Sequence, residues 1–406
     1  DSDHLHITTV DLGDGTPTQI VCGAANVAAG QHVVVATVGT KLYDGDKEFA
    51  IKKSKIRGVE SFGMICAEDE IGVGTSHDGI IELPETVKPG TLAKDYYNVK
   101  DDYMFEVDLT PNRIDAASHF GVARDLAAWM KAQGMQADLH SPSVDAFHSD
   151  RADGAIPVEV ECQEAAIRYA GLTIRGVKVA ESPEWLRNYL TAIGQRPINN
   201  VVDITNFILN AYCQPLHCFD LAKVKGNKIV VRPAAEGSKF VTLDGVERTM
   251  TARDLMICNA EEPMCIAGVF GGLDSGVTEQ TTDIFLESAC FHPTWVRKTA
   301  RRQGLNTDAS FRFERGVDPN NVIYALKAAA LLVKELAGGE ICGEISDFYP
   351  APVERPTVEL SLDYMSRLIG KTLDKGLVKT ILAALEMEIE KETDDVLTLR
   401  IPTYRV

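Results

Sequence analysis

The chain has 406 residues, of which 45% are hydrophobic and 25% charged, and its formal net charge at pH 7 is −18. These values are typical of folded globular protein, and the length exceeds what one hydrophobic core usually supports, so we expect two to four domains. The negative charge argues against indiscriminate nucleic-acid binding, because a polyanion would be repelled unless it met local basic patches.

Membrane and metal functions find no support in the pattern of residues. The sequence contains no apolar run of the roughly 20 residues that a membrane-spanning helix needs, and no basic-then-apolar leader. The nine Cys are scattered and form no C-x-x-C pair, which indicates reduced thiols and predicts no metal site. We therefore expect a cytoplasmic protein.

Residues 1–98 are predicted to be β-rich. Short apolar runs at 20–23, 33–39, 49–58, 63–67 and 79–83 are separated by Gly, Asp, Asn and Pro, a pattern typical of a small barrel. The region carries a basic patch, which is either a solvated charged face or a nucleic-acid contact; it consists of Lys52, Lys53, Lys55 and Arg57. A second basic patch, with the same two interpretations, consists of Arg297, Lys298, Arg301 and Arg302.

Residues 99–150 are predicted to form a partial small α+β domain followed by a linker. A strand is expected from residue 103, then a turn at Thr110, and then a helix that Ser118 caps and Gly134 ends. Residues 135–155 lack apolar periodicity and are predicted to be a linker.

From 151 to 352 strands and helices alternate, which predicts an α+β domain of about 200 residues. A hairpin is expected around Asp244-Gly245, and a long helix is expected over VIYALKAAALLVKELAGG, where apolar residues repeat at three and four. Residues 353–406 then predict a strand, two helices and another strand.

Several residue types that can carry chemistry stand near turn and cap signals. His217, Asn206, Glu287 and the run Thr307–Ser310 are such residues, while phosphate-loop, zinc-protease and nucleophile-elbow motifs are absent from the sequence. The glycines of AGVFGG, among them Gly268 and Gly271, indicate a tight turn where backbone approaches either packed protein or a ligand.

Residues 196–220 (RPINNVVDITNFILNAYCQPLHCFD) and 285–316 (FLESACFHPTWVRKTARRQGLNTDASFRFERG) closely resemble the editing domain of bacterial phenylalanyl-tRNA synthetase β subunits. The resemblance spans nearly the whole chain. It implies a multidomain α+β fold with an N-terminal OB-fold β-barrel (1–98), a B3/B4 editing domain (151–352) and the truncated start of a winged-helix-like B5 domain (353–406). The other half of the small domain would precede the barrel, so that domain is expected to be incomplete.

The resemblance further implies that the chain binds tRNA(Phe) and hydrolyses mischarged tyrosyl-tRNA(Phe). Aminoacylation would be carried by the α subunit of an α2β2 heterotetramer. ATP and Mg²⁺ would serve that holoenzyme, and no cofactor or metal is expected in this fragment because the family's magnesium carboxylates would fall just past Val406. The alternative is a non-catalytic tRNA-binding and assembly scaffold.

Roles for single residues follow from the same resemblance. Glu287 would accept a hydrogen bond from the tyrosine hydroxyl, which phenylalanine lacks, so a buried acceptor would stay unpaired when phenylalanine enters. His217 and Asn206 would be catalytic-site polar groups, His217 orienting the attacking water or the terminal ribose. The remaining implied residues line the editing pocket (Thr307, Ala309, Gly268 and Gly271) or contact the tRNA backbone (Lys52, Lys53, Lys55, Arg57 and Ser61).

Each assignment has a plainer alternative. Glu287 could pair with a nearby Arg, His217 could be a hydrogen-bonded core residue, and Asn206 could hold a turn. The sequence departs from the common family text mainly around Ala211 to Cys218, next to His217.

Overall fold

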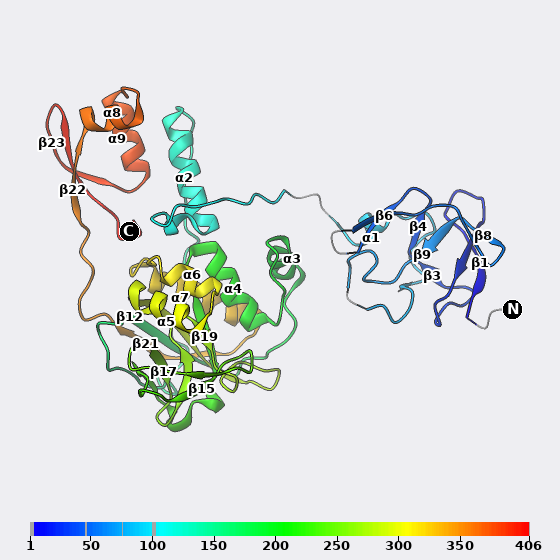
Figure 1. Ribbon diagram of the computed structural model, residues 1–406, viewed down its shortest axis with the longest axis horizontal. Helices are drawn as coiled ribbons and strands as arrows, with labels where there is room; N and C mark the ends of the chain where they lie inside the picture. Colours follow the sequence, from blue (N-terminus) through cyan, green and yellow to red (C-terminus); the bar gives the residue numbers. More distant parts are fainter. Residues whose placement is uncertain (1–3, 45–46, 75, 100–102, 406) are drawn as a thin grey trace. The chain divides into compact units, whose positions relative to one another are not determined.

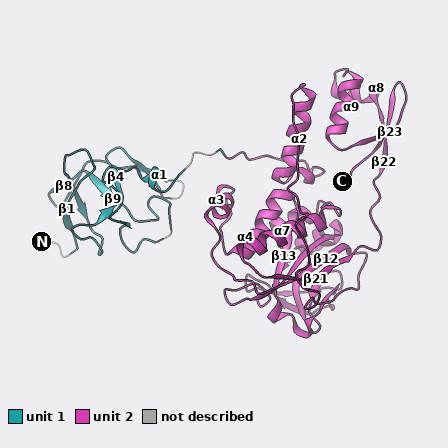
Figure 2. Cartoon of the chain, turned by 180° about the vertical axis from the view of Figure 1, so that it is seen from behind, with its two compact units in different colours: residues 1–103 teal, residues 104–406 magenta. Residues whose placement is uncertain are grey.

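The computed structural model describes residues 4–44, 47–74, 76–99 and 103–405. The chain forms two compact units, residues 1–103 and 104–406 (Figures 1 and 2). Within the described ranges, no helix combines the length and the apolar character that crossing a membrane requires.

Unit 1 is built from short antiparallel strand pairs, as the sequence predicts. Its elements are β1 (His6–Val10), β2 (Thr18–Cys22), β3 (His32–Val33), β4 (Val35–Thr37), β5 (Lys41–Asp44), β6 (Lys47–Ala50), β7 (Ser54–Ile56), β8 (Val59–Ser61), β9 (Gly63–Ile65), β10 (Glu82–Leu83) and α1 (Ala93–Tyr96). The pairs are β1–β2, β3–β10, β4–β9, β5–β6 and β7–β8. The predicted strand 49–58 is therefore two strands, and the closed barrel itself stays a prediction.

The first segment of unit 2 differs from the prediction at its start. No strand forms in the described part of 103–109, whose side chains are largely exposed and lack a neighbouring strand to pair with. The helix α2 (His119–Ala132) follows η1 (Ile114–Ala116), and Ser118 caps it by accepting a hydrogen bond from the Gly121 N–H, which confirms that part of the prediction.

The centre of unit 2 is a fully antiparallel four-stranded sheet in the order β13-β20-β12-β21. The strands are β12 (Ala166–Arg175), β13 (Leu216–Asp220), β20 (Asp283–Phe291) and β21 (Glu340–Phe348). Two helices cover one face of this sheet, α4 (Asn200–Tyr212) and α7 (Asn321–Leu336). The Ser288 hydroxyl of β20 donates to the Val322 carbonyl of α7 (2.9 Å), which fixes α7 on that face.

A second sheet shares one hydrophobic core with the first. Its order is β11-β14-β17-β18-β19, with strands β11 (Val158–Val160), β14 (Ile229–Pro233), β17 (Leu255–Cys258), β18 (Pro263–Ile266) and β19 (Phe270–Gly271). The predicted hairpin around Asp244-Gly245 is confirmed as β15 (Lys239–Val241) and β16 (Glu247–Thr249), with Gly245 at φ +76°.

Shorter elements connect these layers. They are α3 (Glu184–Ala192), η2 (Leu221–Lys223), η3 (Lys225–Asn227), α5 (Pro293–Gln303) and α6 (Asp308–Phe313). The helix α5 ends at Gly304 in a left-handed conformation, as is common after the last turn of a helix.

The C-terminal part is a three-stranded sheet, β22-β24-β23, with two helices. The elements are β22 (Thr357–Ser361), α8 (Leu362–Ile369), α9 (Lys375–Ala384), β23 (Glu388–Glu392) and β24 (Val396–Arg400). The second helix, predicted over 377–389, ends at Ala384, because residues 388–392 form β23 and pair with β24 instead. A winged-helix-like arrangement stays a prediction.

Candidate functional site

Glu287 lies in the middle of the four-stranded sheet. It belongs to β20, where it is paired with Gly171 of β12 on one side and His217 of β13 on the other. Residues directly opposite each other in an antiparallel pair project from the same face. Because Ser288 points to α7, Glu287 and His217 both project from the other face, toward the second sheet.

The carboxyl group of Glu287 is buried, with 5% of the residue exposed. Its Oε2 accepts a hydrogen bond from the Tyr169 hydroxyl at 2.7 Å, whereas Oε1 accepts none from the described residues. Burial raises the pKa of Glu287 to about 7, and the Tyr169 hydrogen bond acts in the opposite direction. Among the described residues no Arg or Lys forms an ion pair with Glu287, whose pKa is shifted by burial and by Tyr169, so the plainer alternative for this residue is wrong.

His217 is half-buried, and its ring meets that of Phe219 edge-on at 4.5 Å between centroids. Its Nε2 is buried and has no hydrogen-bond partner among the described residues. Burial lowers the pKa of His217 to about 4, so the imidazole is neutral near pH 7. A buried ring nitrogen without a partner is unusual for a purely structural His, and it can bind a ligand's hydrogen-bonding group.

The two candidate glycines have different environments. A Cβ at Gly271 of β19 would lie 3.3 Å from Cε1 of His217. The absence of a side chain at Gly271 therefore avoids a close contact with the imidazole ring. Gly268 has φ +69°, and a Cβ there would lie 2.9 Å from the ring of Phe291 and 3.0 Å from that of Phe313. The predicted close approach is thus to the candidate site at Gly271 and to packed protein at Gly268.

Thr307 connects α6 to the turn that carries these glycines. Its hydroxyl caps α6 by accepting from the Ser310 N–H (3.0 Å) and donates to the Val269 carbonyl (2.9 Å). Ala309 is half-buried and packs against the main core. The hydroxyl of Thr307 is therefore a structural link, and a pocket-lining role for Thr307 and Ala309 stays a prediction.

Asn206 lies on α4, which packs against β13. It is half-buried, and its backbone carbonyl accepts a hydrogen bond from the side-chain amide of Asn210 at 2.8 Å. Asn210 is bonded in turn to Gln195 and Arg312. None of these bonds reaches Glu287 or His217, so a catalytic role for Asn206 stays a prediction.

Three further residues complete the surroundings of Glu287 and were missed in the sequence. Tyr169 is its hydrogen-bond donor, and Cys265 of β18 lies near its carboxyl group. Gly171, opposite Glu287, leaves space that the ring of Phe285 fills, since a Cβ there would lie 2.0 Å from it. The only sequence signal was a Tyr and a Gly in the middle of the β-like run that forms β12.

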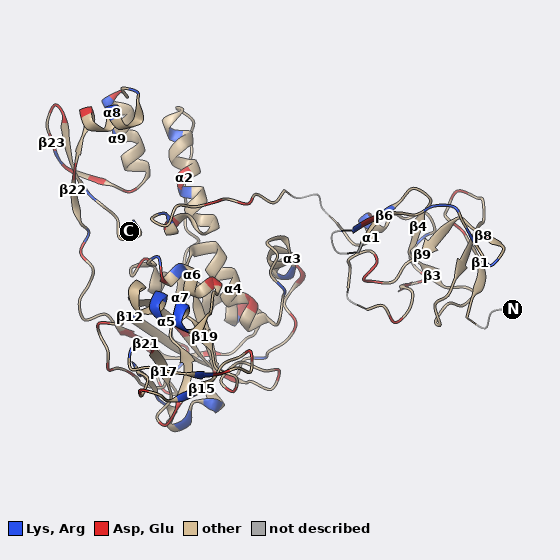
Figure 3. Cartoon of the chain, viewed as in Figure 1, with Lys and Arg blue, Asp and Glu red and all other residues tan. Residues whose placement is uncertain are grey.

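In unit 1, the candidate tRNA-contacting cations are exposed. Lys52, Lys55 and Arg57 lie on the surface, whereas Lys53 pairs with Glu60 (2.9 Å) and lies over the Phe62 ring. Lys and Arg are interspersed with Asp and Glu over both units (Figure 3), so any contact with a polyanion would be local.

Ser61 requires a correction. It is 1% exposed, accepts a hydrogen bond from the Val21 N–H (3.0 Å) and donates to the Gly63 carbonyl (3.1 Å). Its hydroxyl holds strands together inside unit 1, and a side chain so placed does not reach a tRNA backbone.

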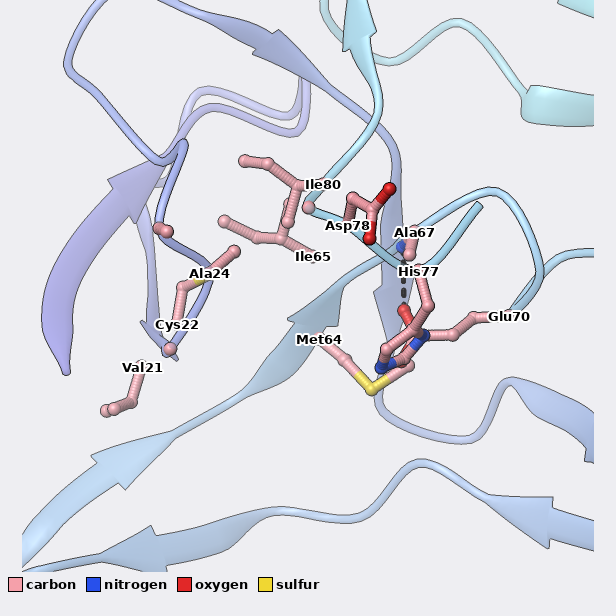
Figure 4. Close-up of a pocket in the computed structure, with 13 residues that line it drawn as sticks. Val21, Cys22, Ala24, Met64, Ile65, Ala67, Glu70, His77, Asp78 and Ile80 are labelled. Atoms are coloured by element: carbon pink, nitrogen blue, oxygen red, sulfur yellow. Dashed lines mark hydrogen bonds between the residues drawn. The ribbon is translucent and has the colours of Figure 1, made fainter. Parts of the chain in front are cut away.

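A cavity of about 390 Å³ opens in unit 1 (Figure 4). Its lining includes the side chains of Glu70, His77 and Asp78 over an apolar floor that includes Ile65 and Ile80. Two carboxylates disfavour phosphate at this place, so the exposed Lys and Arg residues are the better candidates for backbone contact.

Three family models match the chain in succession. They are a tRNA-binding domain over residues 1–92, the B3/4 domain over 165–338 and the tRNA synthetase B5 domain over 358–406. Glu287, His217 and Tyr169 all lie within the B3/4 match, and the basic patch of unit 1 lies within the first.

Curated relatives match over the whole chain. Phenylalanine–tRNA ligase beta subunits from Bacteroides fragilis, Porphyromonas gingivalis and Desulfotalea psychrophila are 68%, 60% and 45% identical to it. Each alignment covers 100% of this chain and 49% of the relative, so the chain spans about half the length of these proteins. A solved N-terminal fragment of the phenylalanyl-tRNA synthetase beta subunit from Pyrococcus horikoshii covers 73% of this chain and 80% of its own, with 17% identity and a TM-score of 0.32, which is too low to support an argument.

Proposed function

Since this chain belongs to the family of phenylalanine–tRNA ligase β subunits, we propose that it binds tRNA(Phe) and hydrolyses tyrosyl-tRNA(Phe) made in error. The observation that carries this proposal is the buried carboxyl group of Glu287. It faces the second sheet without a cation, one of its oxygens accepts no hydrogen bond from the described residues, and His217 lies directly beside it.

The carboxyl group supplies the selectivity. A phenolic hydroxyl entering the site donates to Oε1, on which no described residue places a hydrogen bond, whereas a phenylalanine ring covers that oxygen without pairing it. An unpaired buried acceptor costs about 1–3 kcal/mol, and more when it is charged. A general aromatic pocket, by contrast, rejects an added hydroxyl only weakly.

His217 supplies the second part of the reaction. Its neutral Nε2 can hold a water molecule or a ribose hydroxyl at the ester bond, since none of the described residues forms a hydrogen bond with it. Hydrolysis then adds the elements of water across the ester, releasing tyrosine and the free 3′ end of the tRNA. We infer that positioning dominates the rate, with the tRNA's own ribose hydroxyl contributing.

The other proposed roles follow the family. Unit 1, as an OB-fold barrel, contacts the tRNA backbone through Lys52, Lys53, Lys55 and Arg57, and residues 353–406 form the start of a winged-helix-like domain. The α subunit is the expected partner in an α2β2 assembly in the cytoplasm. ATP and Mg²⁺ would serve aminoacylation in that assembly; the described residues contain no cluster of three His, Cys, Asp or Glu that could hold a metal ion, and no step proposed here passes through either cofactor.

The test compares the deacylation of tyrosyl-tRNA(Phe) and phenylalanyl-tRNA(Phe) by the complete β subunit assembled with its α partner. Glu287→Gln keeps the shape of the side chain and removes its charge, so we expect the preference for the tyrosyl ester to fall. Glu344→Gln, an exposed position on β21 of the same sheet, is the matched control and should leave the preference unchanged.

Two outcomes would contradict the proposal. An unchanged preference in Glu287→Gln would remove the site assignment. tRNA binding that falls steeply with salt, without any ester hydrolysis in the unaltered protein, would favour the non-catalytic scaffold instead.

A further inference from the structure

Tyr169 is a fully buried phenol whose hydroxyl bonds to the carboxyl group at the candidate site. The residue is 0% exposed, and it lies on β12 opposite Ala289, two positions along β20 from Glu287. From there its ring reaches diagonally across the sheet, and the hydroxyl donates to Oε2 of Glu287 at 2.7 Å. Glu287 is its one hydrogen-bond acceptor among the described residues, and a buried hydroxyl without an acceptor would be costly.

We propose that Tyr169 is a positioning residue that sets the specificity of the site, because its hydroxyl occupies Oε2 of Glu287 and leaves Oε1 as the single acceptor for an incoming phenol. This inference rests on the proposed editing function and deepens it. The carboxyl group would then be held between two phenols, one belonging to the chain and the other to the aminoacyl group that is removed.

The reason lies in the number of acceptors that the carboxyl group offers. A carboxylate has two oxygens, and each is an acceptor. If both were free, water could enter beside a bound phenylalanine and satisfy them, which would weaken the rejection of the cognate ester. With Oε2 bonded to the Tyr169 hydroxyl, Oε1 is the oxygen on which no described residue places a hydrogen bond, and it is left for the incoming hydroxyl.

Among the titratable groups around the carboxyl group, Glu287 is the one that changes charge near neutral pH. Burial and the adjacent carboxylate hold the pKa of Tyr169 well above its usual range, and the same two causes hold the pKa of the Cys265 thiol high. Burial lowers the pKa of His217, so its ring is neutral as well. The hydrogen bond from Tyr169 favours the ionised carboxylate, which accepts a stronger hydrogen bond from a phenol than the neutral acid does.

The test uses the complete β subunit assembled with its α partner, and the ratio of tyrosyl- to phenylalanyl-tRNA(Phe) deacylation as a function of pH. The ratio cancels the pH dependence of the ester bond itself. Tyr169→Phe removes one oxygen atom and keeps the ring. We expect the ratio to fall about tenfold or more, as for the loss of a hydrogen bond to a charged group, and its pH midpoint to move upward. Most of the loss should appear in KM for the tyrosyl ester.

The control is Tyr324→Phe, which removes a hydroxyl that donates to the Pro142 carbonyl within residues 135–155. It should change neither the ratio nor the midpoint. If Tyr169→Phe does not fold, replacement of Tyr169 by 3-fluorotyrosine provides a second test. Its more acidic hydroxyl donates more strongly, so the midpoint should move downward.

The possible results separate the inference from its premise. A Tyr169→Phe enzyme with the ratio and midpoint of the unaltered protein, or a fluorinated enzyme with an unmoved midpoint, overturns the role of Tyr169 alone. If the unaltered protein shows no preference for the tyrosyl ester, the proposed function fails and this inference fails with it.

Discussion

Glu287 and His217 lie opposite each other on adjacent antiparallel strands, yet they do not form a salt bridge. Burial disfavours the charged form of both groups, and it therefore moves their pKa values in opposite directions, to about 7 for the acid and about 4 for the base. Between those values both side chains are largely neutral. A buried acid and base without counter-charges are costly for stability, and such groups cluster at functional sites.

The first prediction concerns stability and pH. In the folded chain the pKa of Glu287 is raised from its ordinary value of 4.5 to about 7, so the folded state holds a proton that the unfolded state has already lost. The contribution of Glu287 to the free energy of unfolding is fully present below pH 4.5. It is lost as the pH rises through 7, by about 3 kcal/mol in total. Glu287→Gln removes this loss. Its free energy of unfolding, measured with denaturant from pH 4.5 to 8, should therefore rise relative to that of the unaltered chain.

Glu344→Gln is the control for this series and should run parallel to the unaltered protein. A constant difference between Glu287→Gln and the unaltered chain across the pH range would show that Glu287 is not buried as described.

The second prediction separates rate from selectivity. His217→Ala removes the group that would position water or ribose at an ester of either amino acid. We expect the turnover of tyrosyl- and phenylalanyl-tRNA(Phe) to fall by a similar factor, on the order of a hundredfold, with their ratio nearly unchanged. Single-turnover deacylation measures both quantities. A variant that loses selectivity and keeps its rate would contradict the role given to His217.

The third prediction uses two nearby glycines, Gly268 in the turn between β18 and β19 and Gly271 in β19. Gly268→Ala forces an alanine into a left-handed conformation and against two aromatic rings, so we expect a loss of about 2 kcal/mol of stability or more. Gly271→Ala places a methyl group against His217 without that strain, so it should change stability little and lower the deacylation rate roughly tenfold. Thermal unfolding and deacylation assays on both variants check this contrast, and equal effects on stability would refute it.

The fourth prediction concerns unit 1 and salt. Replacing Lys52, Lys55 and Arg57 together by Gln should weaken tRNA(Phe) binding and reduce the salt dependence of its affinity. Plotted as the logarithm of the binding constant against the logarithm of the salt concentration, the affinity has a negative slope. Each lost phosphate contact makes that slope shallower by about 0.7–0.9. Adding Lys53→Gln should weaken tRNA binding further but by less than any of the other three substitutions, since the Lys53 ammonium is paired with Glu60 and must leave it to contact a phosphate.

Lys41→Gln, also an exposed ion-paired lysine of unit 1, is the control for this series. Ser61→Ala should destabilise unit 1 and leave the slope unchanged, because its hydroxyl is buried between strands. An unchanged slope in the triple variant would place the tRNA contact elsewhere.

Local signals in the sequence predicted elements well where they act over a few residues. The Ser118 cap, the Asp244-Gly245 hairpin and the long helix α7 all formed where expected. Two predictions failed where the outcome depended on distant partners. The strand expected from residue 103 finds no neighbouring strand, and the last residues of the helix predicted over 377–389 belong instead to β23, which pairs with β24.

The sequence by itself indicated the family, the expected order of the modules and Glu287 and His217 as candidates, because a resemblance is carried by residues at matching positions along the chain. The tertiary structure decided which groups surround the carboxyl group. Tyr169 is 118 positions from Glu287 along the chain, and only the alignment of β12 with β20 brings its hydroxyl into reach. The exclusion of water, which sets the charge of Glu287 and of His217, likewise exists only when the two sheets close over them.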